Sequence, residues 1–191
     1  MSNSDQLPRR GNWVSKNIVK FIFWLTGWKI SGTLPNVPKM IIIGAPHTSN
    51  WDFPLALGLI FHLGIYINWM AKKEFFVKPF SYLWQWLGGV PVDRKAANGM
   101  VGQTIEAIQQ RAKIVLAIAP EGTRSKVERW RTGFYHIAHG ANIPIVPVLA
   151  DYGRKTLVIT EPFHPSGDVE TDLPLLQARY VGVIGKNQDK V

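Results

Sequence analysis

The sequence of 191 residues contains no cysteine. Disulfide bonds, thiolate catalysis and cysteine-based zinc sites are therefore excluded, and a reducing compartment is permitted. Acidic residues are also few, 13 against 22 lysines and arginines, which gives a formal net charge of +9. This excess predicts attraction to polyanions such as anionic lipid, nucleic acid or acidic proteins.

A secretory leader and a membrane span are also not expected. The first residues are polar and lack an early apolar core. Residues 53–70 could cross a bilayer by length alone, with His62 as the only residue that can be charged near neutral pH. Pro54 stands where a helix begins, Gly64 interrupts the run and residues 65–70 are rich in strand formers, so we predict a buried helix over about 53–62 and a strand over 65–70.

Tryptophan, in contrast, is plentiful, with eight residues. The segment Trp13–Trp28 is apolar around most of its circumference, with Lys16 and Lys20 on one side. It fits a helix lying in a lipid interface, and equally an ordinary helix docked on the core. The segment Trp69–Trp86 mixes lysine with aromatic residues and is a second candidate for membrane contact. Its alternative is a helix packed against the N-terminal one.

Most of the remaining chain alternates between strands and helices. Predicted strands cover 39–45, 113–119, 143–150 and 155–160, and predicted helices cover 99–112, 131–141 and 168–184. Such alternation predicts an α/β fold with a single domain and a mostly parallel central sheet flanked by helices. We assign residues 1–30 to a tail and membrane-contacting helix, and 31–191 to the domain itself. Sites in such sheets form beyond the carboxyl ends of the strands.

One titratable pair follows the predicted strand 39–45. His47 and Asp52 are five residues apart, with small polar residues between them. A carboxylate that accepts one ring N–H of a histidine fixes its tautomer and makes it a candidate general base. Alternatively, Asp52 caps the following helix and His47 fills a loop. These two residues alone favour that alternative.

Three further stretches change this interpretation: "LGGVPVDR", which ends at Arg94, "APEGTRS" over 119–125, and "IPIVPV" over 143–148. Together with H-x4-D they resemble, in order, the four blocks of the glycerolipid acyltransferase family, best known from the lysophosphatidic acid acyltransferases. The resemblance covers about half of the chain. It implies that residues 31–191 are an acyltransferase domain.

The resemblance assigns catalysis to His47 as base and Asp52 as its orienting partner. It implies that the phosphorylated acceptor is held by Arg94, Glu121, Gly122, Thr123 and Arg124. The chemistry agrees, because arginine binds phosphate through two parallel N–H groups and Gly122 lets the backbone approach an anion. Glu121 could position Arg124 or a substrate hydroxyl, or simply pair with Arg124 in a turn.

The implied reaction moves a fatty acyl group from a thioester donor to a hydroxyl of a lysophospholipid such as 1-acyl-glycerol-3-phosphate. The donor would be acyl-CoA or acyl carrier protein, with no bound cofactor. We expect a peripheral or monotopic protein on the cytoplasmic face of an anionic membrane. His136 and His139 have a spacing that can ligate metal, but no further motif supports this, and no metal site is predicted.

Two other functions are open to the sequence. In the first, the protein is a thioesterase or lysophospholipase in which His47 activates water. In the second, it is a basic nucleic-acid-binding module. That second reading lacks an RNP-like pattern, a zinc finger or one concentrated basic helix, and leaves H-x4-D and P-E-G-T-R unexplained. We therefore expect no nucleic-acid partner.

Overall fold

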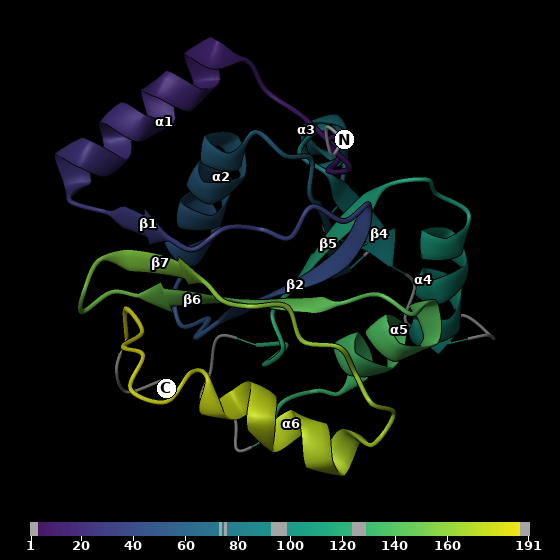
Figure 1. Cartoon of the computed structure of the whole chain (residues 1–191). Helices are drawn as coiled ribbons and strands as arrows, with labels where there is room; N and C mark the ends of the chain where they lie inside the picture. Colours follow the sequence, from purple (N-terminus) through teal and green to yellow (C-terminus); the bar gives the residue numbers. More distant parts are fainter. Residues whose placement is uncertain (1–3, 73, 75, 93–98, 124–128, 188–191) are drawn as a thin grey trace.

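The computed structural model of the chain describes residues 4–72, 74, 76–92, 99–123 and 129–187. Within them, a seven-stranded sheet has the strand order β1-β7-β6-β2-β5-β3-β4 (Figure 1). Neighbouring strands are parallel, except for the antiparallel pair of β6 and β7. The predicted α/β fold with a mostly parallel sheet is confirmed.

The bounds of the elements follow the apolar runs of the sequence. The strands are β1 Lys29–Ser31, β2 Lys39–Ala45, β3 Asn68–Lys72, β4 Gly89–Val92, β5 Ile114–Ile118, β6 Ile145–Asp151 and β7 Thr156–Ile159. The helices are α1 Trp13–Thr26, α2 Asp52–Leu63, α3 Phe80–Trp86, α4 Gly99–Gln109, α5 Gly133–Ala141 and α6 Val169–Ala178. β2 has the predicted bounds, and residues 53–70 form a helix and then a strand, as predicted.

Other predictions of elements were incomplete. The short strand β1 was not predicted, and α3 lies within 69–86, where a helix was the alternative to membrane contact. The strand after α2 begins at Asn68 and not at residue 65. The C-terminal helix ends at Ala178 and not at 184. The amides of residues 179–181 donate to carbonyls three residues back instead of four, and the chain then turns at Gly182, where φ is +79°. There the Ile184 carbonyl accepts a hydrogen bond of 2.8 Å from the Tyr152 amide.

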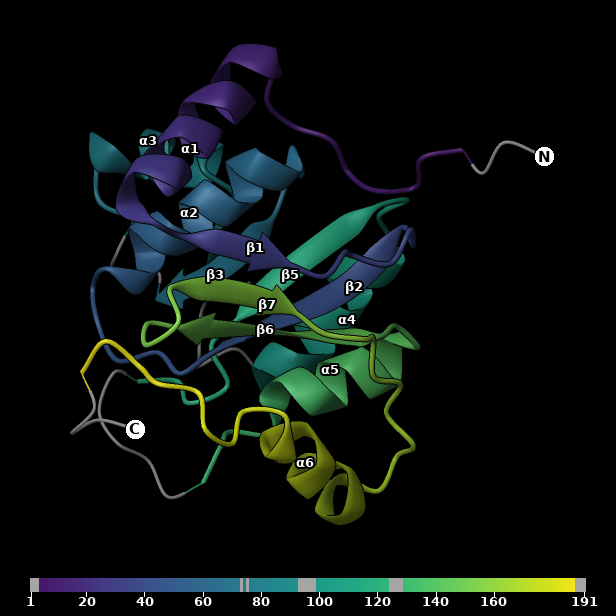
Figure 2. The same cartoon turned by 60° about the vertical axis from the view of Figure 1, so that its left-hand side comes forward.

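The two faces of the sheet carry two separate cores. In β2, Met40 and Ile42 belong to the core shared with α1 and α2, whereas Ile41 and Ile43 belong to the core shared with α4, α5 and α6. This alternation is the period-2 pattern of a strand buried on both faces. Figure 2 shows the same layers, with α1 and α2 on one side of the sheet and α5 and α6 on the other.

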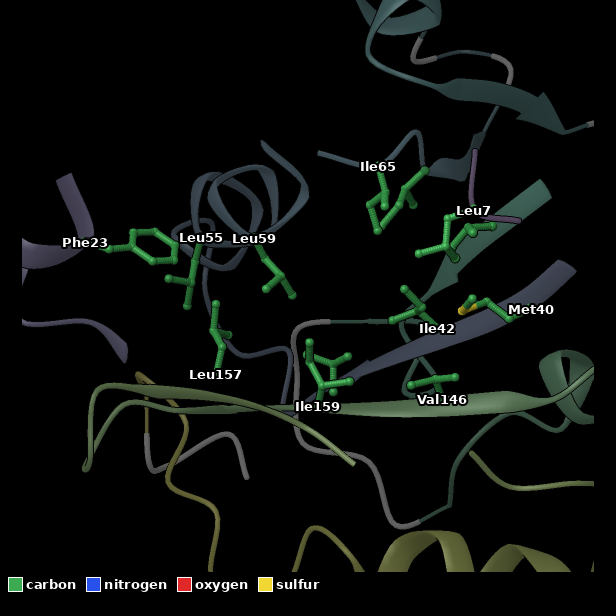
Figure 3. Packing of buried hydrophobic residues seen from close by; sticks show 13 residues of the cluster. Leu7, Phe23, Met40, Ile42, Leu55, Leu59, Ile65, Val146, Leu157 and Ile159 are labelled. Carbon is green, nitrogen blue, oxygen red and sulfur yellow. The ribbon is translucent and has the colours of Figure 1, made fainter. Parts of the chain in front are cut away.

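Helix α1 joins the first of these cores through one side only. The Asn12 side chain accepts a hydrogen bond from the Ser15 amide and caps its start, and Gly27 ends it at φ +76°. Phe23 is its one buried residue and lies with Leu55 and Leu59 of α2 in the core (Figure 3). Helices of the described ranges are all too short or too polar to span a bilayer.

Candidate active site

Three neighbouring strands end at one edge of the sheet, and a functional side chain follows each of them. β2 is paired in parallel with β5 on one side and with β6 on the other. His47 follows β2, Glu121 follows β5 and Tyr152 follows β6. The carboxyl edge of the sheet therefore brings together residues that are 74 and 100 positions apart in the chain.

His47 and Asp52 face each other across a tight turn. The His47 Nδ1 atom lies 3.2 Å from Oδ2 of Asp52, and the same oxygen accepts a hydrogen bond of 2.8 Å from the Ser49 amide. Asp52 is buried, whereas the His47 side chain keeps 25% of its surface exposed. The pair combines an enclosed carboxylate with an imidazole that a substrate can reach.

Asp52 is the first residue of α2, but it does not occupy the N-cap position. Trp51 does, and the Asp52 carboxylate bonds His47 and the Ser49 amide instead. Ser49 supports this turn as well, because its Oγ accepts a hydrogen bond of 3.2 Å from the Trp51 amide. A negative charge in the first turn of a helix is favourable, so the position of Asp52 also suits α2 itself.

Hydrogen bonds decide the ionisation of Asp52. Burial would raise its pKa, but hydrogen bonds from His47, Tyr152 and the Ser49 amide outweigh burial and bring the pKa below the ordinary value of 3.8. Asp52 is therefore ionised at neutral pH. Its carboxylate holds Nδ1–H of His47, which leaves Nε2 as the ring nitrogen able to accept a proton.

Glu121 contacts the backbone of the same turn. Its Oε2 atom accepts a hydrogen bond of 2.9 Å from the His47 amide. Burial raises the pKa of Glu121 above its ordinary value of 4.5, although the His47 amide partly opposes this. The predicted site residue Glu121 thus lies beside His47. The sequence did not predict this contact, and its predicted contact with Arg124 or a substrate hydroxyl stays a prediction.

The remaining predicted binding residues are described only in part. Gly122 adopts φ +66°, and a Cβ there would come within 2.7 Å of the Arg131 side chain. Glycine is therefore favoured in this turn, in which Gly122 and Thr123 are both exposed. Arg94 and Arg124 lie outside the described residues.

Two contacts of the segment 47–52 were not predicted. The Tyr152 hydroxyl donates a hydrogen bond of 2.7 Å to Oδ1 of Asp52. Asn187 donates to Thr48 twice, from its amide to Oγ1 at 3.2 Å and from its side chain to the carbonyl oxygen at 2.9 Å. The strand pattern carried a signal for Tyr152, since it directly follows β6 at the edge where sites form. The sequence held no comparable signal for Asn187.

The fold and the site together define an α/β protein with a histidine–aspartate pair at the carboxyl edge of its central strand. Comparison with protein families matches residues 13–151 to the family described as Acyltransferase. This match covers more than half of the chain and includes His47, Asp52 and Glu121. The chain belongs to the Acyltransferase family, as its motifs predicted.

Individual relatives agree with this assignment. The chain is 32% identical over 153 residues to a 1-acyl-sn-glycerol-3-phosphate acyltransferase of Cocos nucifera, covering 74% of this chain and 47% of that protein. It is 30% identical over 111 residues to the Escherichia coli protein of the same name, covering 54% of this chain and 44% of that protein. The chain therefore spans about half the length of the curated relatives it matches.

A solved structure shares the fold. The crystal structure of the 1-acyl-sn-glycerophosphate acyltransferase of Thermotoga maritima matches with a TM-score of 0.61 at 23% identity, covering 87% of this chain and 75% of that one. At this identity the likeness shows the fold.

Proposed function

We propose that this protein transfers a fatty acyl group from a thioester donor to a hydroxyl of a lysophospholipid such as 1-acyl-glycerol-3-phosphate. The observation that carries the proposal is the contact of His47 Nδ1 with the buried Asp52 carboxylate, at 3.2 Å. Membership of the Acyltransferase family and similarity to two 1-acyl-sn-glycerol-3-phosphate acyltransferases support the reaction class. The donor is acyl-CoA or acyl carrier protein.

The chemistry starts at the second ring nitrogen of His47. Nε2 removes the proton of the acceptor hydroxyl as its oxygen attacks the thioester carbonyl. Asp52 stabilises the imidazolium that forms. When the tetrahedral intermediate collapses, the C–S bond breaks, and the thiolate takes the proton back from Nε2. An ester and a free thiol result, and the enzyme returns to its starting state without an acyl-enzyme.

The acceptor's phosphate requires cations and N–H donors near the pair. We assign this role to Arg94 and Arg124, with Gly122 and Thr123 supplying the exposed turn on which the glycerol phosphate rests. The position of Glu121 against the His47 amide supports this arrangement, because it ties the turn after β5 to the catalytic turn after β2. The turn that binds the substrate and the turn that carries His47 are then fixed relative to each other.

The acceptor and the product are membrane lipids, so we propose that the protein works on the cytoplasmic face of an anionic membrane. Helix α1 exposes an apolar row made of Trp13, Val14, Ile18, Phe21, Ile22, Trp24 and Leu25. Helix α3 exposes Phe80, Tyr82, Leu83 and Trp86. Figures 1 and 2 place both helices on the same side of the sheet. Exposed aromatic residues beside lysines favour an interfacial position, and the net charge of +9 favours anionic lipid.

The reaction is tested by product analysis. The purified chain is incubated with vesicles that contain a panel of lysophospholipids, together with acyl-CoA or acyl carrier protein loaded with the same chain. Mass spectrometry should detect a new diacyl phospholipid and a free thiol in equal amounts. Free fatty acid in place of the ester would show a hydrolase and would overturn the proposal.

The membrane position is tested by sedimentation with anionic vesicles at low salt. Wild type should sediment, and Trp24→Ser should weaken binding about tenfold, because one exposed Trp loses its burial in lipid. Leu175→Ser on α6 is the matched control, since this residue is also exposed but lies on the opposite side of the sheet. Wild-type protein that stays in the supernatant would contradict the membrane position.

A further inference from the structure

The two oxygens of the Asp52 carboxylate have different partners. Oδ2 lies 3.2 Å from His47 Nδ1 and accepts a hydrogen bond of 2.8 Å from the Ser49 amide. Oδ1 accepts a hydrogen bond of 2.7 Å from the hydroxyl of Tyr152, which is 100 positions away in the chain. A buried carboxylate that lacks a donor on one oxygen is destabilised and free to rotate. The Tyr152 hydroxyl therefore anchors the oxygen opposite His47.

Tyr152 is itself held at both ends. Its amide donates a hydrogen bond of 2.8 Å to the Ile184 carbonyl, so the backbone after β6 is tied to the C-terminal segment. Its ring meets the ring of Trp28 edge to face, with centroids 5.0 Å apart and planes at 89°. Such aromatic pairs prefer this geometry. The hydroxyl is thus presented to Asp52 by a fixed ring.

Tyr152 acts as a donor over the whole working range of pH. Burial raises the pKa of Tyr152, and the hydrogen bond and negative charge of Asp52 raise it further. The hydroxyl therefore keeps its proton at neutral pH and can only donate to Oδ1. The titratable groups that face Asp52 are His47 on its own turn, Tyr152 after β6 and Glu121 after β5.

We propose that Tyr152 is a positioning residue of the acyl transfer reaction, which orients the Asp52 carboxylate so that His47 presents Nε2 to the acceptor hydroxyl. This inference rests on the proposed function and extends the histidine–aspartate pair to a third side chain. The role is indirect, because the Tyr152 hydroxyl donates to Asp52 and acts on His47 only through that carboxylate. Its loss should therefore lower kcat and leave KM unchanged.

The chain offers a matched control for a Tyr152→Phe variant. The Tyr135 hydroxyl donates to Oδ2 of the buried Asp172, also at 2.7 Å, between α5 and the start of α6. Tyr135→Phe removes the same type of hydrogen bond from a region outside the candidate site. Any effect that both variants share reports on stability alone, and any effect limited to Tyr152→Phe reports on the site.

The experiment measures kcat and KM for wild type and both variants. Tyr152→Phe should lower kcat about tenfold with KM unchanged. Tyr135→Phe should keep the kcat and the KM of wild type. Equal kinetics in the two variants would overturn the proposal.

A second readout does not depend on activity. In protein labelled with ¹³C at the aspartate carboxyl carbons, NMR follows the titration of Asp52, which Asp52→Asn assigns. Wild type should show Asp52 titrating below its ordinary value, and Tyr152→Phe should raise this pKa while Tyr135→Phe leaves it in place. An unchanged Asp52 titration in Tyr152→Phe would overturn the positioning role. If the NMR shift occurs but wild type forms no ester, the proposed function fails and the contact with Asp52 stands.

Discussion

Two buried aspartates of this protein each accept a 2.7 Å hydrogen bond from a tyrosine hydroxyl, and their remaining partners set them apart. Asp52 accepts from Tyr152 and also from His47 and the Ser49 amide. Asp172 accepts from Tyr135 and from the Ser166 amide at 2.7 Å. The same bond therefore supports a reachable imidazole in one region and joins two structural segments in the other.

The surroundings of the two tyrosines differ in the same way. Tyr135 is 1% exposed and belongs to the core between the sheet, α5 and α6. Tyr152 is only partly buried and lies where β6 ends, at the edge of the sheet that carries His47 and Glu121. The enclosed hydrogen bond between Tyr135 and Asp172 therefore mainly stabilises the fold. The hydrogen bond between Tyr152 and Asp52, at an edge that substrate can reach, can also contribute to catalysis.

The largest expected effects come from exchanging each aspartate for asparagine. Asp52→Asn should lower kcat by about 10²- to 10⁴-fold, because an amide does not hold His47 in the tautomer with a free Nε2. Asp172→Asn should keep kcat but lower the free energy of unfolding by about 1–3 kcal/mol, because a buried charge-assisted hydrogen bond is lost. Steady-state kinetics and urea unfolding measure both quantities. Equal losses of activity in the two variants would remove the distinction between the regions.

A smaller effect is expected at Glu121. Glu121→Gln replaces the charged acceptor of the His47 amide by a neutral one, which weakens that bond by about 1 kcal/mol. We expect kcat to fall about fivefold if this weakening appears fully in the transition state. The variant Glu170→Gln on α6 is the control, since this exposed carboxylate pairs with Arg129 at the surface. A kcat of Glu121→Gln equal to that of the control would mean that catalysis does not depend on the hydrogen bond between the His47 amide and the Glu121 carboxylate.

The smallest effect concerns the acid stability of the fold. Hydrogen bonds outweigh burial at both Asp52 and Asp172, so the pKa of each is lower in the folded state than the ordinary 3.8. The unfolded chain then binds protons first as pH falls, and both groups contribute stability above about pH 4 that is lost below it. Asp52→Asn and Asp172→Asn should each flatten the fall in unfolding free energy between pH 6 and 3 (roughly the range that spans this titration). If the unfolding free energy of a variant falls as steeply as that of wild type, the pKa of the replaced aspartate is not lowered by folding, and the account is contradicted.

Much of the fold follows from local sequence, whereas the site does so only in part. The apolar run of β2, bounded by Pro38 and Pro46, predicted that strand with its correct bounds. His47 and Asp52 were recognisable as a pair because they are only five residues apart. The contact of Tyr152 with Asp52 joins residues 100 positions apart, and it depends on the register of β6 against β2, which no local pattern encodes.

Short elements escaped prediction for a related reason. β1 has only three residues, too few for an alternating pattern to identify it, and it is a strand because it pairs with β7. α3 has only seven residues, too few for a helical period to define its bounds, and it exposes most of its aromatic residues. In both cases tertiary pairing or a proposed lipid surface, rather than local periodicity, accounts for the segment.

The central claim is that the His47 imidazole carries the acyl transfer, and His47→Ala tests it most directly. Alanine keeps the backbone N–H that donates to Glu121, so the turn should remain intact and the melting temperature should stay close to that of wild type. Turnover of lysophospholipid with a thioester donor should fall by about 10²- to 10⁴-fold. A folded His47→Ala protein that forms the ester at a rate near that of wild type would contradict the account.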